Sequence, residues 1–283
     1  MDPIGCFRHP GGIRSVSITR RLFTRASCLM KETTHDETDG VPKREAGPVG
    51  DAVTVVPIGI VHSCFKEKFG IPRQPGLVPE SRAILKIQPA FDRPEAFREL
   101  DTFSHIWIVF VFHASMKTDW KATVRPPRMG GNRRVGVFAT RSGFRPNPLG
   151  MSVVRLEAIT RHQKQTCLHL KGVDLLDGTP VLDIKPYLPY ADSIPEAHGG
   201  FAAERPASDI AVCFDPDVRI FCLEKERNGY PGFMTLIEQM LKADPRPAYH
   251  AANCRKRRFG MKLYDFDIQW EICDNIVRVY QIT

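Results

Sequence analysis

Arginine, aspartate, proline and glycine gather in four short segments that stand at the ends of apolar runs. The segments read PRQPG at 72–76, RPPRMGGN at 125–132, ATRSGFRPNPLG at 139–150 and LDGTPVLDIKPY at 176–187. Because proline fixes φ and glycine permits positive φ, such loops hold rigid backbone shapes. Taken singly, Asp177-Gly178 is also typical of a plain hairpin turn. Together, rigid loops that carry arginine and aspartate favour a binding site for a charged ligand.

The formal charge of the 283-residue chain is +8, and most of it lies near the N-terminus. Residues 1–31 hold six basic residues and one acid, a net +5, which leaves +3 for residues 32–283. Within that nearly balanced part, residues 120–156 carry eight basic residues and no acid, and residues 242–262 carry seven basic residues and one acid. A charge run is often only a solvated face, but two such runs on one body favour a polyanionic partner.

The elements that must position these loops are mostly strands. Apolar, β-branched runs predict strands at 54–62, 82–89, 103–112, 135–139, 152–159, 167–175 and 181–184, with a short helix at 94–100. Seven short strands with almost no helix favour a closed β-barrel or a sandwich over alternating βαβ units. The sequence lacks the GxGxxG fingerprint, the GxxxxGK[ST] phosphate loop and the GxSxG elbow, so the folds that carry them have no support.

The composition changes after Tyr190, and a second, smaller α+β domain is expected. In a predicted helix at 231–243, apolar residues recur at i, i+3, i+4, i+7 and i+8, which is one helix face. The predicted domains are a mainly β barrel at 51–192, a linker at 193–208 and a small α+β domain at 209–283. The other predicted elements of the second domain are a strand at 210–214, a helix at 215–227 and strands at 261–264, 267–272 and 277–282.

Residues 1–50 are expected to form a disordered extension with a linker. The arginine-rich, acid-poor residues 1–31 resemble an organelle transit peptide, and an extension of a cytosolic protein is an equal alternative. The expected location is therefore cytoplasmic or organellar. The most apolar run, 106–112, is too short for a membrane-spanning helix, and the eight cysteines form no Cys-x-x-Cys pair. We expect no membrane contact and no metal.

A resemblance to a known family rests on long, irregular strings. They are KEKFGIPRQPG, FSHIWIVFVFH, TVRPPRMGGN, GVFATRSGFRPNPLGMS, DLLDGTPVLDIKPYLPYADS, DPRPAYH and LYDFDIQW. In these strings residues 54–283 resemble the TrmO family of tRNA adenosine N6-methyltransferases. The resemblance implies a non-Rossmann barrel methyltransferase that uses S-adenosylmethionine, and a homodimer with its cofactor sites near the subunit interface. It implies as substrate the threonylcarbamoyl-modified adenosine next to the anticodon, position 37, of a threonine tRNA.

The resemblance also assigns residues to roles. The expected cofactor contacts are Pro72, Arg73, Gln74, His105, Ile106, Arg134, Arg141, Asp177, Gly178, Thr179 and Pro180. The two basic stretches, 120–156 and 242–262, and not the resemblance, supply the expected RNA contacts, which are Arg125, Arg128, Arg145, Asn147, Arg255, Lys256, Arg257 and Arg258.

Methyl transfer to a urea-like nitrogen benefits from alignment and from a group that removes or orients its proton. Asp183, Lys185 and Tyr187 stand on one segment and are the predicted catalytic residues. For Asp183 a structural ion pair or turn cap is the alternative. Two other functions stay open: a non-catalytic RNA-binding protein of the same fold, and a methyltransferase that acts on another RNA or on a small molecule.

Overall fold

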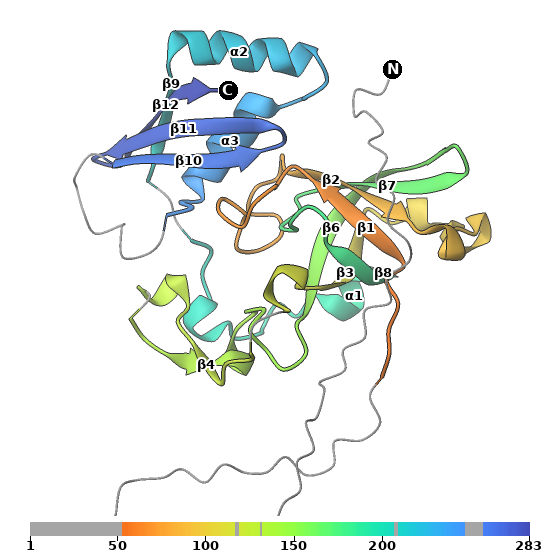
Figure 1. The fold of residues 1–283 in the computed structure, drawn as a ribbon. Coiled ribbons are helices and arrows are strands. Elements are labelled where there is room, and N and C mark those ends of the chain that lie inside the picture. Colours follow the sequence, from red (N-terminus) through yellow and green to blue (C-terminus); the bar gives the residue numbers. More distant parts are fainter. Residues whose placement is uncertain (1–52, 117–118, 131, 207–208, 247–256) are drawn as a thin grey trace, which may run out of the picture. The chain divides into compact units, whose positions relative to one another are not determined.

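A computed structural model describes residues 53–116, 119–130, 132–206, 209–246 and 257–283. Six strands form a closed barrel in the order β1-β2-β7-β6-β3-β8, with every described pairing antiparallel (Figure 1). The barrel strands are β1 (Gly59–Ser63), β2 (Arg82–Ile87), β3 (His105–Val111), β6 (Leu149–His162), β7 (Gln165–Lys171) and β8 (Pro180–Pro186). The barrel fold predicted from the sequence is confirmed.

The barrel interior follows from the period of two along each strand. In β2 the burial alternates residue by residue, and in β3 the side chains of Ile106, Ile108 and Phe110 point into the core. The outward-facing residues between them are the half-exposed ones, as a barrel wall requires. Gly150 on β6 lies opposite Phe110, and a side chain there would collide with the Phe110 ring. Glycine at 150 therefore lets a large aromatic fill this end of the barrel.

Short elements replace two of the predicted ones. The predicted strand at 135–139 is wrong in its extent, because only Val135–Gly136 (β5) is extended, paired with Thr123–Val124 (β4), and a turn of 3₁₀ helix follows. The predicted helix at 94–100 is two 3₁₀ turns with Arg98 and Glu99 between them. The 3₁₀ turns are Pro89–Phe91, Pro94–Phe97, Leu100–Thr102, His113–Ser115, Pro127–Met129, Val137–Ala139 and Gly200–Ala202, and α1 is Pro189–Asp192.

The C-terminal part is a four-stranded sheet, in the order β10-β11-β12-β9, with two helices (Figure 1). Its apolar helix face is confirmed, because Phe233, Leu236, Ile237, Met240 and Leu241 are all buried. The turn between β11 and β12 is the two-residue pair Asp274-Asn275, both at positive φ, which suits a tight hairpin. The elements are β9 (Ala211–Phe214), α2 (Pro216–Arg227), α3 (Phe233–Lys242), β10 (Arg257–Leu263), β11 (Phe266–Cys273) and β12 (Ile276–Ile282).

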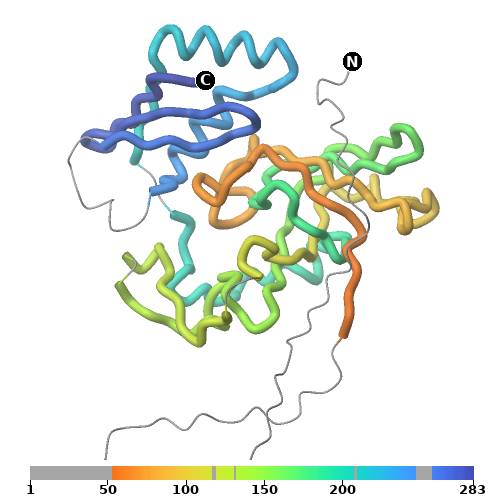
Figure 2. The backbone as a smooth tube through the Cα atoms, in the orientation of Figure 1, coloured from red at the N-terminus to blue at the C-terminus, as the bar shows by residue number. Residues whose placement is uncertain are grey.

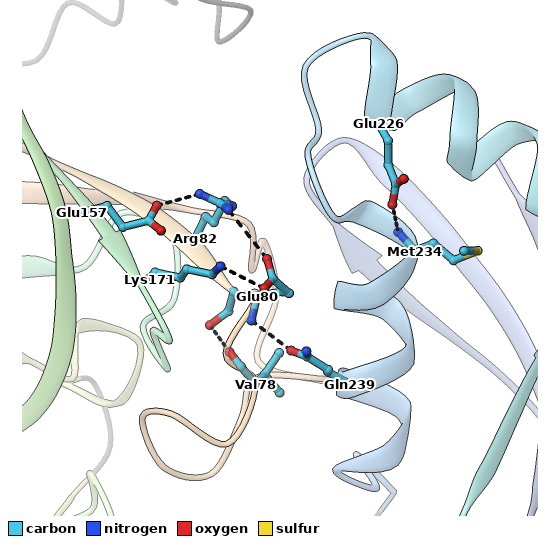
Figure 3. Close-up of polar contacts among 9 residues, drawn as sticks. Val78, Glu80, Arg82, Glu157, Lys171, Glu226, Met234 and Gln239 are labelled. Atoms are coloured by element: carbon cyan, nitrogen blue, oxygen red, sulfur yellow. Dashed lines mark hydrogen bonds and ion pairs between the residues drawn. The ribbon is translucent and has the colours of Figure 1, made fainter.

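Barrel and C-terminal residues share one hydrophobic core. The backbone N–H of Tyr264 donates to the carbonyl of Cys64 at 2.7 Å, and Phe65 forms an isolated antiparallel β-bridge with Leu263. The backbone N–H of Glu80 donates to Oε1 of Gln239 on α3 at 2.9 Å (Figure 3). The carboxylate of Glu80 in turn contacts Lys171 at 2.8 Å, so one residue links the barrel wall to α3. These contacts hold α3 against the loop between β1 and β2.

Two findings bear on the remaining expectations. Within the described residues, no helix is long and apolar enough to cross a membrane. The arginine-rich residues 1–31, which carry the transit-peptide prediction, lie outside the described residues.

Candidate functional site

A cavity of about 1800 Å³ opens beside the barrel. Its walls come from the loop between β1 and β2, the β4–β5 segment, the turn at 138–144, the chain at 199–206 and the end of α3. Figure 2 shows the yellow-green β4–β5 segment beside the blue-green chain around residue 200. Segments that are distant in sequence therefore form one site.

The cavity wall is strongly basic. Nine basic residues line it against two acids, Glu204 and Asp244. Among the described residues, the one cavity arginine that forms an ion pair is Arg246, whose Nε lies 2.7 Å from Oδ1 of Asp244. Lys242 also forms an ion pair, with its Nζ 2.6 Å from Oε1 of Glu238. The other seven cavity cations form no ion pair among the described residues, so their charge is available to an anionic ligand. The basic residues are Arg73, Lys121, Arg125, Arg128, Arg134, Arg141, Arg205, Lys242 and Arg246.

Four predicted cofactor residues meet in this cavity. Nη1 of Arg141 donates to Oε1 of Gln74 at 2.6 Å, and Nη1 of Arg134 donates to Oγ1 of Thr123 at 3.2 Å. The guanidinium of Arg73 donates to the carbonyls of Asp244 and Arg246. Pro72, a fifth predicted cofactor residue, directly precedes Arg73 in the sequence and is buried. The PRQ loop and the Arg141 turn are thus fixed against each other and present guanidinium groups to the cavity.

The predicted DGTP segment lies elsewhere, at the turn before β8. Oδ1 of Asp177 accepts from the backbone N–H of Ser63 at 2.9 Å, and its Oδ2 lies 3.1 Å from Nζ of Lys66. Gly178 has φ +76°, a conformation that glycine adopts without strain, and its N–H donates to the carbonyl of Val61. In this chain Asp177 therefore locks the turn to the end of β1.

Thr179 and Pro180 continue the same turn. The buried Thr179 donates from Oγ1 to the carbonyl of Leu176 at 2.6 Å, and the same oxygen lies 3.5 Å from Nδ1 of His113. Burial lowers the pKa of His113, and the charge of Lys68 adds to this, so both effects favour the neutral imidazole. Pro180 pairs with Ile60 of β1. The segment is a rigid corner of the barrel.

His105 and Ile106 lie at the opposite end of the same strand pair. Ile106 pairs with Pro186 of β8, whereas Phe110 pairs with Val181, close to the DGTP turn. Four residues of extended strand span about 13 Å. The cofactor residues assigned by the resemblance therefore fall into three groups within one chain.

The three predicted catalytic residues are on or next to β8. Nζ of Lys185 lies 2.9 Å from Oδ2 of Asp183, and Oδ1 of Asp183 accepts from the N–H of Ile184. Both side chains are about half exposed, so the pair contributes little stability. Tyr187 packs edge-on against His105, with 6.5 Å between ring centroids, and lies 6.1 Å from Trp107. These groups face outward from the barrel and not into the basic cavity.

The predicted RNA contacts also lie in separate parts of the structure. Arg125 and Arg128 line the cavity. Nη1 of Arg145 donates to the carbonyls of Thr140 and Ser142, and Asn147 is exposed at the end of that turn. On β10, Nε of Arg258 lies 3.8 Å from Oε2 of Glu271, and Arg257 is half-buried. Arg255 and Lys256 lie outside the described residues.

Two features escaped the sequence reasoning. Asp174 accepts a 2.6 Å hydrogen bond from Oγ of the buried Ser152, and burial raises the pKa of this carboxyl to about 6, against the effects of that bond and of the Arg141 charge. Phe138 lines the cavity with 74% of its surface exposed. Asp174 stands in the quoted DLLDGTPV string, which was the available signal. Phe138 sits in an apolar run, so its sequence gave no sign of exposure.

Within the described residues, no group of three or more His, Cys, Asp or Glu side chains could hold a metal ion. The comparison with known proteins decides the family. The tRNA-methyltransferase O N-terminal domain matches residues 60–193, and the TrmO C-terminal domain matches residues 207–283. The chain belongs to the TrmO family. This confirms the family resemblance.

Relatives of the TrmO family match along most of the chain. The tRNA (adenine(37)-N6)-methyltransferase of Escherichia coli is 45% identical over 225 residues, which are 80% of this chain and 95% of that protein. A Pseudomonas aeruginosa protein that bears the name of an S-adenosylmethionine-dependent methyltransferase is 48% identical over 217 residues, 77% of this chain and 91% of its own length. A crystal structure of TrmO from Pseudomonas aeruginosa superimposes with a TM-score of 0.68 at 40% identity, covering 82% of this chain and 99% of that one. The predicted enzyme class and cofactor are confirmed: an S-adenosylmethionine-dependent tRNA methyltransferase.

Proposed function

We propose that the protein transfers the methyl group of S-adenosylmethionine to N6 of the threonylcarbamoyl-modified adenosine at position 37 of a threonine tRNA. The observation that carries the proposal is the basic cavity, with nine basic residues and two acids. A folded RNA brings a phosphate backbone to such a wall, and the threonylcarbamoyl group adds a carboxylate of its own. Membership of the TrmO family supports the reaction type.

The residues of the cavity suit the charges of the cofactor and the substrate. Arg141, positioned by Gln74, is suited to a carboxylate, because a guanidinium binds carboxylates through two parallel hydrogen bonds. S-adenosylmethionine, when bound, supplies an electrophilic methyl group on a sulfonium. The chain aligns the two reactants, and alignment alone is worth several orders of magnitude in rate. Asp183, Lys185 and Tyr187 stay our proposal for the groups that orient or accept the N6 proton.

We also propose that the active form is a homodimer. The outer face of the β6-β3-β8 wall exposes Met151 by 54% and Leu149 by 38%, and Tyr190 beyond β8 by 87%. His105, Trp107 and Tyr187 border the same face. A second copy that covers this face would hide the apolar side chains and bring a second set of cofactor loops near His105. This arrangement accounts for the separation of His105 from the DGTP turn in one chain.

Methyl transfer with purified full-length protein tests the substrate. The protein is incubated with methyl-labelled S-adenosylmethionine and threonine tRNA that either carries or lacks the threonylcarbamoyl group. We expect label in the modified tRNA and at least about tenfold less in the unmodified one. Equal labelling of both would overturn the proposed substrate, and cofactor binding without any transfer would favour a non-catalytic RNA-binding protein.

A further inference from the structure

Phe138 is the most exposed phenylalanine among the residues that the structure describes. Its exposed fraction is 74%, whereas the neighbouring Val137 is 1% exposed. Burial of a large aromatic ring is one of the strongest contributions to folding, so an exposed one forgoes that gain. The ring lines the basic cavity, where a ligand could cover it.

Backbone hydrogen bonds hold the residues on either side of Phe138 in the sequence. The N–H of Val137 donates to the carbonyl of Ala122, and the N–H and Oγ1 of Thr140 both donate to the carbonyl of Val137. The N–H of Ser142 then donates to Oγ1 of Thr140 at 3.2 Å. This network fixes the one-turn helix Val137–Ala139, so the backbone that carries the ring is in place before any ligand binds.

A cation accompanies the ring. The guanidinium carbon of Arg145 lies 6.0 Å from the centroid of the Phe138 ring, and its Nη1 is anchored on the carbonyls of Thr140 and Ser142. Arg145 therefore holds a positive charge beside the ring without a carboxylate partner among the described residues. An aromatic face next to an anchored guanidinium is the combination that binds an unpaired nucleobase and its phosphate.

The cavity is large enough for a nucleobase in addition to a cofactor. Ligand pockets for one small molecule hold about 300–1,000 Å³. This cavity holds about 1800 Å³, and Phe201 and Phe144 line it together with Phe138. Arg125 and Arg128 lie on the same wall. The space beyond the loop of Arg73 and Gln74 is thus lined with aromatic rings and positive charge.

We propose that Phe138 is a stacking platform for an unpaired base of the tRNA anticodon loop, with Arg125 and Arg128 binding the adjacent phosphates. The proposal rests on the proposed function, because it assumes a tRNA in this cavity. It adds the recognition mode: the ring reads single-stranded bases by stacking, whereas the arginines bind any phosphate backbone. An aromatic at 138 should therefore distinguish a loop from a duplex.

Binding of two RNAs to the full-length protein tests the platform. One RNA is an anticodon stem-loop, and the other is a duplex of equal charge without unpaired bases. Loss of one base–aromatic stack corresponds to about 5- to 150-fold in affinity. We expect Phe138→Ala to weaken stem-loop binding by that factor and to leave duplex binding unchanged. Phe138→Tyr should bind the stem-loop like the natural protein, and Phe138→Leu should bind like the alanine variant.

The matched control is Phe91→Ala, which removes another partly exposed phenylalanine (38%) that does not line the cavity. It should bind both RNAs normally. Stem-loop binding by Phe138→Ala equal to that of the natural protein would overturn the platform, and so would an equal loss for the duplex. Affinity for S-adenosylmethionine and methyl transfer by the natural protein are measured alongside. If those two fail, the proposed function fails, whatever Phe138 does.

Discussion

Asp174 is the one carboxyl group among the described residues whose pKa is clearly raised. Burial raises the pKa of its carboxyl from 3.8 to about 6, so the folded state holds the proton more tightly than the unfolded chain does. Below about pH 4 the carboxyl is protonated in both the folded and the unfolded state, so its burial does not lower the free energy of unfolding. Between about pH 4 and 6 the unfolded chain ionises first, so the free energy of unfolding falls as the pH rises. Above about pH 6 the carboxyl is ionised in both states, and the full decrease in the free energy of unfolding is present.

Asp174→Asn should remove this cost while keeping an oxygen that accepts from Ser152. We expect equal stability of the variant and the natural protein near pH 4, and an unfolding free energy higher by about 1–3 kcal/mol in the variant at pH 8. Urea unfolding at pH 4, 6 and 8 measures both. A difference that does not depend on pH would contradict the assignment of this group.

Arg141 is the residue that we expect to hold a carboxylate in the cavity, because Gln74 fixes its guanidinium. Arg141→Ala should lower kcat/KM by about 10- to 150-fold, the value of one charged hydrogen-bonded contact. Arg141→Lys should recover little, since an ammonium cannot form the two parallel bonds. Arg219→Ala, at an exposed position of α2, is the control and should leave kcat/KM unchanged. Activity of Arg141→Ala within about twofold of the natural enzyme would remove Arg141 from the site.

At the scale of elements, the outer face of β6-β3-β8 carries the dimer proposal. Met151→Asp puts a charge among the exposed apolar side chains of this face, where a second copy would bury it. We expect the variant to sediment as a folded monomer and to lose most of its methyl transfer. Ile220→Asp on α2, where Ile220 is 65% exposed, should stay dimeric and active. A Met151→Asp protein that keeps the natural mass in solution and full activity would exclude this face.

The helices and strands were predicted well where the apolar residues recurred with one clear spacing, that of a strand or that of a helix. The alternation in 82–87 and the helical spacing of Phe233 to Leu241 both appear in the structure, because each pattern had one face to bury. The strand prediction for 135–139 is wrong after Gly136, because Val137 is the one buried residue of the 3₁₀ turn and Phe138 and Ala139 line a cavity. Which loops meet was not predictable: Gln74 and Arg141 are 67 residues apart, and the barrel closure brings them together. The separation of His105 from Asp177 likewise follows from strand pairing and not from sequence spacing.

At the scale of the whole molecule, charge is concentrated and not spread. The formal charge of residues 32–283 is only +3, yet the cavity collects nine basic residues. Phosphate binding releases counterions from the RNA, so the logarithm of affinity falls linearly with the logarithm of salt concentration. If about five phosphates are bound, we expect a slope of about −4 for tRNA. Arg125→Ala should reduce the magnitude of that slope by about one.

A slope near zero would exclude a phosphate-binding cavity, and an unchanged slope in Arg125→Ala would remove that residue from the contact. Arg219→Ala again serves as the control, since it removes one positive charge from α2. Its slope should equal that of the natural protein.

The position of the transferred methyl group tests the central claim most directly. Threonine tRNA that carries the threonylcarbamoyl group is incubated with the full-length protein and methyl-labelled S-adenosylmethionine. It is then digested with a base-specific ribonuclease and analysed by mass spectrometry. We predict one labelled methyl group, on N6 of the modified adenosine at position 37, and at least about tenfold less label in the same tRNA without the threonylcarbamoyl group. Label on another nucleotide, or equal label on an unmodified adenosine 37, would contradict the account.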